Sequence, residues 1–331
     1  MNRQSLSALD QIRVRQGKAR LQKIFHGLAL RNRPRALSYL NEEKLQFPSL
    51  YLLMPEIRGL DLYEDLNPRN IEALKTCAKI LDDENLGMRV GPFLQQDNKT
   101  TQQTLQWIFA TGAQWQGQGK TGAYDAVIDG VTALLTRAYE DKNVLPAVAD
   151  MIFTRNRQGY FIHDLVWAFF QSFDPDALKL VAKHLLSRNS QDVELACKLL
   201  HLPLPQETGR GADMQKQYQD YLTWLEENKS FLYFTREYFH LTSDPQPVDV
   251  DMSAKYVCKR ISPKNKKTLE PLTAGEQRSL QVFEKMPGEK QKILSDYSYK
   301  IHEQDLSLWH QWIQKQLGEQ IIIAQAELEG N

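Results

Sequence analysis

The chain has 331 residues, of which 42% are hydrophobic and 25% are charged, and this composition predicts a folded protein with a packed core. Lys and Arg together number 41, as do Asp and Glu, so a global electrostatic attraction to nucleic acid or to anionic lipid is excluded. No stretch reaches the roughly 18 uninterrupted apolar residues that a transmembrane helix needs, and we expect no membrane partner.

The cysteines bear on the compartment. Cys77, Cys197 and Cys258 lie far apart, and an odd, scattered set argues against a disulfide framework and suits a reducing environment. The first residues contain no apolar core of signal-peptide length. We therefore predict a cytoplasmic location.

Residues 1–95 are predicted to form an N-terminal helical region with a basic first helix. Apolar residues recur at helical spacing over Ser5–Leu30, which predicts that helix. Asn67 followed by Pro68 predicts the start of another, because Asn caps helices and the missing N–H of proline costs nothing in the first turn. We expect that helix to end near Gly87.

The most informative stretch contains an internal repeat. The fourteen residues from Leu145 align without gaps to the fourteen from Leu178, and six positions are identical. With one residue deleted, the preceding segments also align. Each repeat unit is therefore predicted to be a pair of helices. In the second unit, residues 161–173 form the first helix and Asp174 caps the second, which starts at Pro175.

The period of the repeat, roughly 33 residues with two helices per unit, is typical of an α-solenoid. The second helix of the pair carries Val181, Ala182, Leu185 and Leu186 on one stripe and resembles HEAT-like repeats, whereas the tetratricopeptide signature is absent. We predict a HEAT-like helical repeat region over residues 96–241. The fold class is thus predicted to be all-α, a helix-pair solenoid with extra N- and C-terminal helices.

Beyond the repeat region the helical pattern is interrupted. Residues 242–272 are predicted to be a polar, basic linker, in which the weakly alternating VDVDM forms either a short extended piece or more linker. A capping box of Thr273 and Glu276 is expected to open a C-terminal helical segment, residues 273–331. A long final helix is predicted there over residues 289–328.

No catalytic or metal-binding signature survives inspection. The glycine-rich stretch ending in Gly119-Lys120-Thr121 lacks both the upstream glycine and the preceding strand of a phosphate-binding loop. Glu194, Cys197 and His201 share one helical face, but no second cluster supplies further zinc ligands, so Cys197 is interpreted as a core residue. We predict no cofactor.

Aromatic side chains are concentrated in two helices. One contains His163, Asp164 and Trp167, and the other is predicted over residues 214–241. His163 and Asp164 are adjacent and diverge by about 100° on a helix, so a hydrogen bond between them is not expected. Core packing is the first interpretation of these rings, and His163, Asp164 and Trp167 are our candidates for partner contact or for a pocket.

Two segments of the chain are rich in Lys and Arg, although the chain as a whole carries equal numbers of basic and acidic residues. Residues 1–35 hold nine Lys or Arg against one acid, Asp10, and residues 255–267 hold six against none. Such runs suit contact with phosphates or with an acidic protein surface, and the alternative is a solvated polar face. The candidate contacts are Arg13, Arg15, Lys18, Arg20, Lys259, Arg260, Lys264, Lys266 and Lys267.

Three functions remain open at this stage. The first hypothesis is a non-catalytic protein–protein interaction or scaffold protein, because stacked helix pairs expose an extended binding surface. The alternative is a nucleic-acid-binding protein that contacts phosphates through the basic first helix and the 255–267 loop. The least favoured is an enzyme whose site is assembled from distant residues near His163.

Overall fold

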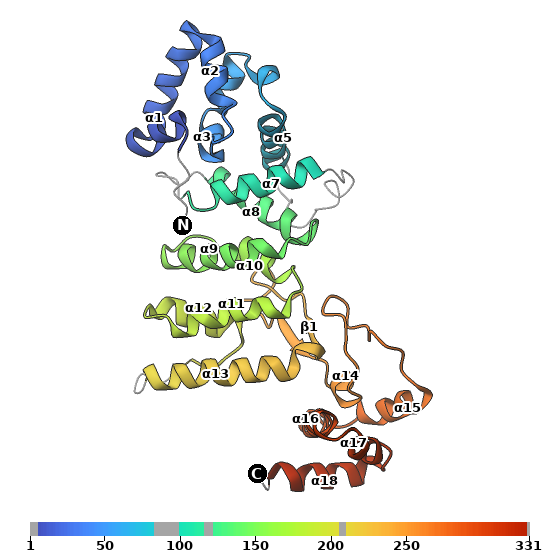
Figure 1. Cartoon of the computed structure of the whole chain (residues 1–331). Coiled ribbons are helices and arrows are strands. Elements are labelled where there is room, and N and C mark those ends of the chain that lie inside the picture. The colour runs from blue at the N-terminus through green and yellow to red at the C-terminus, as the bar shows by residue number, and fades with distance from the viewer. Residues whose placement is uncertain (1–5, 83–98, 116–121, 205–209, 330–331) are drawn as a thin grey trace. The chain divides into compact units, whose positions relative to one another are not determined.

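The computed structural model describes residues 6–82, 99–115, 122–204 and 210–329 (Figure 1). Helices make up 71% of the structure and strands 3%, so the predicted all-α class is confirmed. The chain divides into two compact units, Met1–Ser172 and Phe173–Asn331, here called unit 1 and unit 2. The predicted boundary at residues 95 and 96 lies outside the described residues, and the other predicted boundaries stay predictions.

Unit 1 is helical from its first described residues onward. Side-chain caps explain several of the helix starts: Ser7 accepts a hydrogen bond from the Asp10 N–H, and Asn67 accepts one from the Asn70 N–H, as predicted for the Asn-Pro start. The helices are α1 (Ala8–Arg31), α2 (Arg33–Leu40), α3 (Phe47–Leu52), α4 (Met54–Gly59), α5 (Pro68–Asp82), α7 (Lys99–Gly112), α8 (Gly122–Arg137), α9 (Leu145–Arg157) and α10 (His163–Phe170).

The core of unit 1 lies between successive helices. Helix α1 packs against α2, α3 and α4, and α3 packs against α7. Helices α5, α7 and α8 contact one another, and α10 packs on α8 and α9. Phe25, Leu50, Ile108, Leu134 and Leu165 are each at most 1% exposed, so every layer of these contacts is filled by large apolar side chains.

Helix α1 is broken within its length, which corrects the prediction of one continuous first helix. Gly17 has φ 79° and ψ 178°, a backbone conformation that is essentially restricted to glycine. The helical pattern of apolar residues continues on both sides, so the periodicity conceals the break. A second helical segment therefore starts at Lys18, with the positive end of its dipole at the break.

Unit 2 contains two groups of elements. Helix α11 (Leu178–Ala182) continues into a 3₁₀ turn, η4 (Lys183–Leu186), which packs against α12 (Ser190–Leu199) and α13 (Arg210–Asn228). The second group packs α16 against α14, α17 and α18 around Tyr256, Phe283, Trp309 and Trp312, all buried. Its elements are β1 (Leu232–Phe234), β2 (Val248–Val250), α14 (Met252–Tyr256), α15 (Ala274–Phe283), α16 (Gly288–Gln304), α17 (Leu306–Ile313) and α18 (Leu317–Glu329).

Two long helices predicted in unit 2 are wrong. The helix expected over residues 214–241 ends at Asn228 and is followed by β1. The helix expected over residues 289–328 is divided into α16, α17 and α18, because Asp305 is extended, with φ −151°, and its side chain caps α17. The apolar residues of the three helices still face one core, because Trp309 and Trp312 pack there with residues of α16.

The segment 242–272, predicted as a polar linker, contains β2 and α14. The first three residues of its VDVDM sequence form β2, which pairs antiparallel with β1, with Leu232 opposite Val250. Of the two alternatives, the short extended piece is therefore confirmed. Tyr256 is fully buried and anchors the second core, so this segment carries packing as well as charge. The predicted capping box of Thr273 and Glu276 is present at the start of α15.

The sequence repeat has a counterpart in local structure. Asp141 and Asp174, at equivalent positions of the two copies, each cap a 3₁₀ turn by accepting a hydrogen bond from the N–H two residues later, at 3.1 and 3.2 Å. Leu145 and Leu178 then start α9 and α11 and are 2% and 0% exposed. The two copies therefore begin alike, although α11 tightens into a 3₁₀ turn after its short α-helical part.

None of the helices that the structure describes is both long enough and apolar enough to cross a bilayer.

Candidate functional site

The candidate site is a cleft of about 780 Å³ in unit 1, beside the break in α1. We call it the α1 cleft. Its volume lies within the range of about 300–1,000 Å³ that is usual for ligand pockets. Its described lining residues are Arg13, Val14, Gly17, Lys18, Gln22, Tyr51, Leu52, Met54, Pro55, Arg58, Leu81, Trp115 and Ala123.

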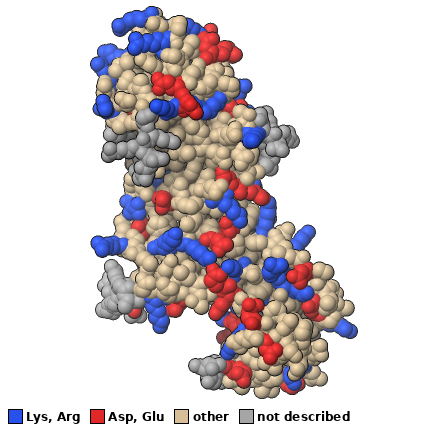
Figure 2. All heavy atoms as spheres, in the orientation of Figure 1, with Lys and Arg blue, Asp and Glu red and all other residues tan. Residues whose placement is uncertain are grey.

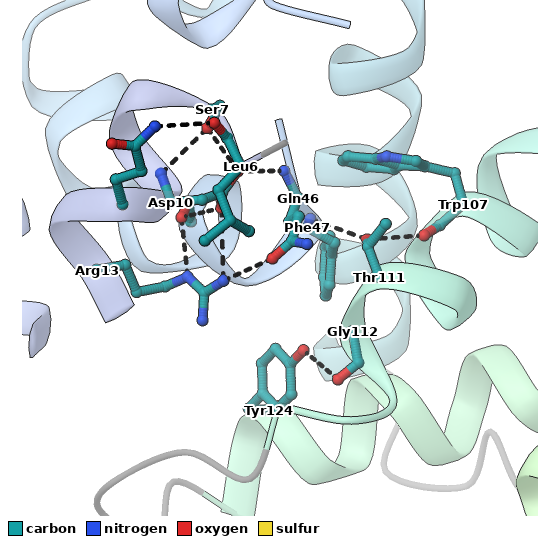
Figure 3. A network of polar contacts seen from close by, with 12 residues as sticks. Leu6, Ser7, Asp10, Arg13, Gln46, Phe47, Trp107, Thr111, Gly112 and Tyr124 are labelled. Carbon is teal, nitrogen blue, oxygen red and sulfur yellow. Dashed lines mark hydrogen bonds and ion pairs between the residues drawn. The ribbon is translucent and has the colours of Figure 1, made fainter. Parts of the chain in front are cut away.

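One wall of the cleft is built on a buried ion pair in α1 (Figure 3). Asp10 is fully buried, and its carboxylate accepts hydrogen bonds from the hydroxyls of Ser7 and Ser49, and from the Gln46 N–H at 3.0 Å. Arg13, 7% exposed, lies 3.5 Å from Asp10 and donates to Ser49 Oγ at 2.9 Å and to Gln46 Oε1 at 2.8 Å. This network joins α1 to the start of α3.

The start of α3 is held from a second side by α7. The Phe47 N–H donates to Thr111 Oγ1 at 3.0 Å, and the Thr111 hydroxyl donates to the Trp107 carbonyl at 2.8 Å (Figure 3). Two backbone donors that begin a helix, those of Gln46 and Phe47, are thus satisfied by side chains from α1 and α7. Helix α3, which carries Tyr51 and Leu52 into the cleft, is therefore fixed in place.

Two aromatic rings, Tyr51 and Trp115, form another part of the lining, and Tyr124 packs against both of them. Tyr124 stacks on Phe47 with ring centroids 5.8 Å apart, and it meets Tyr51 and Trp115 edge-on at 5.0 and 4.5 Å. The Tyr124 hydroxyl donates to the Gly112 carbonyl at 2.9 Å. Burial raises the pKa of both Tyr51 and Tyr124, so these rings are neutral at physiological pH.

The three cations of the cleft differ in their partners. Arg13 is buried, paired with Asp10 and placed over the Trp115 ring, 5.8 Å from its centroid. Lys18 and Arg58 are exposed, and neither forms an ion pair within the part of the chain that the structure describes. No Asp or Glu is among the described lining residues. The cleft thus presents positive charge that its own described walls leave uncompensated.

The remaining predicted contacts on α1, Arg15 and Arg20, are exposed but are not among the described lining residues of the cleft. On the face drawn in Figure 2, Lys and Arg side chains gather over α1 and α2. Most of the basic side chains predicted on the first helix are therefore exposed at the surface. Arg13 is the exception, because its charge is used inside the fold.

The second basic run is largely neutralised within unit 2. Lys259 lies 3.5 Å from Glu270 and 3.7 Å from Glu276, and Arg260 lies 4.0 Å from Glu270. Lys266 lies 3.7 Å from Asp251 and also 3.7 Å above the Tyr233 ring. Lys264 lies over the Phe173 ring at 5.7 Å, and Lys267 is exposed. Residues 255–267 contain no acid, but Asp and Glu from neighbouring segments pair with several of their cations.

The three candidates in α10 occupy different environments. Trp167 is 6% exposed and lies under the Arg137 guanidinium, 4.9 Å from it, which fits the predicted role in core packing. The His163 ring packs on Phe161, with centroids 4.4 Å apart. Asp164 adds negative charge near the buried Asp129 of α8. Their role in partner contact or in a pocket stays a prediction.

The candidate metal ligands and Cys197 can be compared with the described residues. No group of three or more His, Cys, Asp or Glu there has the arrangement to hold a metal ion. Cys197 is 1% exposed, as expected for a core residue, and burial raises the pKa of its thiol to about 11. The tripeptide Gly119-Lys120-Thr121 lies outside the described residues.

Of the described lining residues, only Arg13 and Lys18 were predicted from the sequence as candidate contacts, and Arg58 and Trp115 are among those that were missed. Arg58 belongs to the short helix α4, which contains Pro55, and lies outside both basic runs, and Trp115 lies in the glycine-rich loop. No local pattern connects either residue to Lys18. Spacing within α1 would have connected only the lining residues of that helix, which are Arg13, Val14, Gly17, Lys18 and Gln22.

Comparison of the chain with protein-family models, with curated proteins and with solved structures found no match.

Proposed function

We propose that the chain is a non-catalytic protein–protein interaction protein that recognises a negatively charged part of its partner in the α1 cleft. One observation carries the proposal: Lys18 and Arg58 line the same cleft without an ion pair among the described residues, and no carboxylate belongs to its described lining. Like charges that line one cleft raise the local electrostatic potential and favour an anionic ligand. The fixed position of α3 supports a preformed site.

The finer fold assignment is also a proposal. The matching caps at Asp141 and Asp174, and the matching buried leucines that follow, support a HEAT-like solenoid that runs through the repeat region. The three cysteines are free, which agrees with the proposed cytoplasmic location. The interaction role rests on the cleft and survives if the solenoid assignment fails.

The test is a binding titration of the full chain with fluorescently labelled poly-L-glutamate at low and moderate salt. The variant Lys18→Glu/Arg58→Glu reverses the two cleft charges. Its matched control, Arg15→Glu/Arg20→Glu, makes the same change in net charge on α1 outside the described lining. We expect the cleft variant to lose about tenfold or more in affinity, equivalent to about 1.4 kcal/mol, and the control to lose less.

The opposite ranking of the two variants would overturn the proposal, because binding would then follow the open face of α1. Duplex DNA in the same titration separates the nucleic-acid alternative. DNA binding with a steep salt dependence that is lost in the Arg15→Glu/Arg20→Glu variant and kept in the cleft variant would favour that alternative. The neutralised 255–267 run argues against it.

A further inference from the structure

The α1 cleft is apolar as well as basic. Val14 and Leu81 line it and are 61% and 39% exposed, although each is a large apolar side chain. Leu52, Met54 and Pro55 contribute further apolar surface to the same lining. Exposed apolar side chains that gather in one cleft are typical of a surface that another molecule covers. A ligand that only supplied negative charge would leave these side chains in water.

The space beside the cations is larger than an isolated anion requires. A cleft of about 780 Å³ has room for several side chains or for a drug-sized molecule. Lys18 follows Gly17 at the break in α1, and Val14 belongs to the turn before it, so charge and apolar surface come from opposite sides of one kink. The occupant must therefore carry acidic and apolar groups close together.

Trp115, one of the two aromatic rings in the described lining, is poorly placed to stack on a nucleobase. The Arg13 guanidinium already lies over the Trp115 ring, and Tyr124 meets that ring edge-on. Single-stranded nucleic acids rely on stacking on open aromatic faces, and duplex backbones present phosphates without apolar groups. A peptide supplies carboxylates and apolar side chains a few residues apart, and it matches both features of the lining.

We infer that the occupant of the α1 cleft is an acidic, amphipathic peptide segment of a partner protein. Asp or Glu of that segment pairs with Lys18 and Arg58, and neighbouring apolar side chains cover Val14 and Leu81. The inference rests on the proposed function and adds the chemical class of the partner to it. Met54 suits such a site, since its unbranched, polarizable side chain adapts to different apolar contacts.

The experiment is a selection of a random peptide library displayed on phage against the full chain, with counter-selection against the Lys18→Glu/Arg58→Glu variant. We expect the selected peptides to be enriched in Asp or Glu together with Leu, Ile or Phe. Synthetic copies of the selected peptides are then titrated by fluorescence anisotropy. The cleft charge variant should bind them about tenfold more weakly or worse.

A second pair of variants tests the apolar half of the inference. Val14→Ser/Leu81→Ser should weaken the selected peptides by about tenfold and leave poly-L-glutamate binding almost unchanged, because the charges remain. The matched control is Leu30→Ser, an apolar residue of α1 that is 67% exposed and is not among the described lining residues. It should bind both ligands as the wild type does.

Three outcomes would overturn the inference and are distinguishable from failure of the proposed function. Peptides enriched in acids alone, with no effect of Val14→Ser/Leu81→Ser, leave an anion site and remove the amphipathic partner. The peptide inference also fails if the selected peptides lack Asp and Glu, or if the charge variant binds them as tightly as the wild type does. Binding of poly-L-glutamate then still tests the proposed function separately. If the Lys18→Glu/Arg58→Glu variant binds both the selected peptides and poly-L-glutamate as tightly as the wild type does, the proposed function fails as well.

Discussion

Asp10→Ala is expected to destabilise unit 1 strongly, because the carboxylate is the only negative charge facing the buried Arg13 within the network drawn in Figure 3. Asp10 is 0% and Arg13 7% exposed, so water cannot replace the lost partner. The substitution also leaves the Gln46 N–H and the Ser49 hydroxyl without their acceptor. Removing one member of a buried ion pair costs about 3–5 kcal/mol.

This free energy corresponds to a fall of about 6–20 °C in the melting temperature of a unit of this size. Differential scanning calorimetry of the full chain measures it, and urea unfolding followed by tryptophan fluorescence gives the free energy. The control is Asp150→Ala, an exposed carboxylate of α9, which should change the unfolding free energy by less than about 0.5 kcal/mol.

A double substitution separates buried charge from packing. Asp10→Ala/Arg13→Met leaves no unpaired charge, so it should cost less than the sum of the two single substitutions, with a coupling energy of about 1–3 kcal/mol. Additive effects within about 0.5 kcal/mol, or a loss below about 1 kcal/mol for Asp10→Ala alone, would refute the reasoning that this pair holds α1 to α3.

Three further predictions concern other parts of the fold. Gly112→Ala places a Cβ 2.8 Å from the Tyr124 hydroxyl and should destabilise unit 1 by about 1–3 kcal/mol in urea unfolding. Asp296→Ala should cost unit 2 more than Lys255→Met does, because Lys255 is 3% exposed and keeps its charge when its partner, 2.6 Å away, is removed; calorimetry of both variants ranks them. Burial outweighs the neighbouring Arg155 and raises the pKa of Asp129 to about 7, so the folded state holds this proton more tightly than the unfolded state. Stability relative to Asp129→Asn should therefore fall as pH rises from about 4 to 7, and unfolding curves at both pH values that show a constant difference would contradict this.

Local chemistry predicted several elements correctly. The starts at Pro68 and near Pro175, and the capping box of Thr273 with Glu276, depend on side chains within a few residues of the backbone groups they satisfy. The repeat alignment matched Leu145 with Leu178, and both residues start a helix and are buried, because the start of a helix is a short-range structure.

Other predictions failed because the helical spacing of apolar residues does not show whether a helix is continuous. An apolar stripe runs through α16, α17 and α18 as it would through one helix, yet Asp305 interrupts the backbone and leaves the stripe facing the same core. Gly17 interrupts α1 in the same way. A helical pattern reports which residues face a core, and it reports less well whether the chain between them is straight.

By itself the sequence determined that this protein is built from helices, where several of them are capped, and that the segments starting at Leu145 and Leu178 begin alike, since each of these depends on contacts made within a turn or two. Only the tertiary structure decided which charges are available to a partner. Arg13 is paired with Asp10, several of the 255–267 cations face acids from other segments, and Lys18 and Arg58 line the same α1 cleft. Whether a charged side chain is compensated depends on the residues that the fold places beside it. These residues are far apart in the sequence, so no local sequence pattern identifies them.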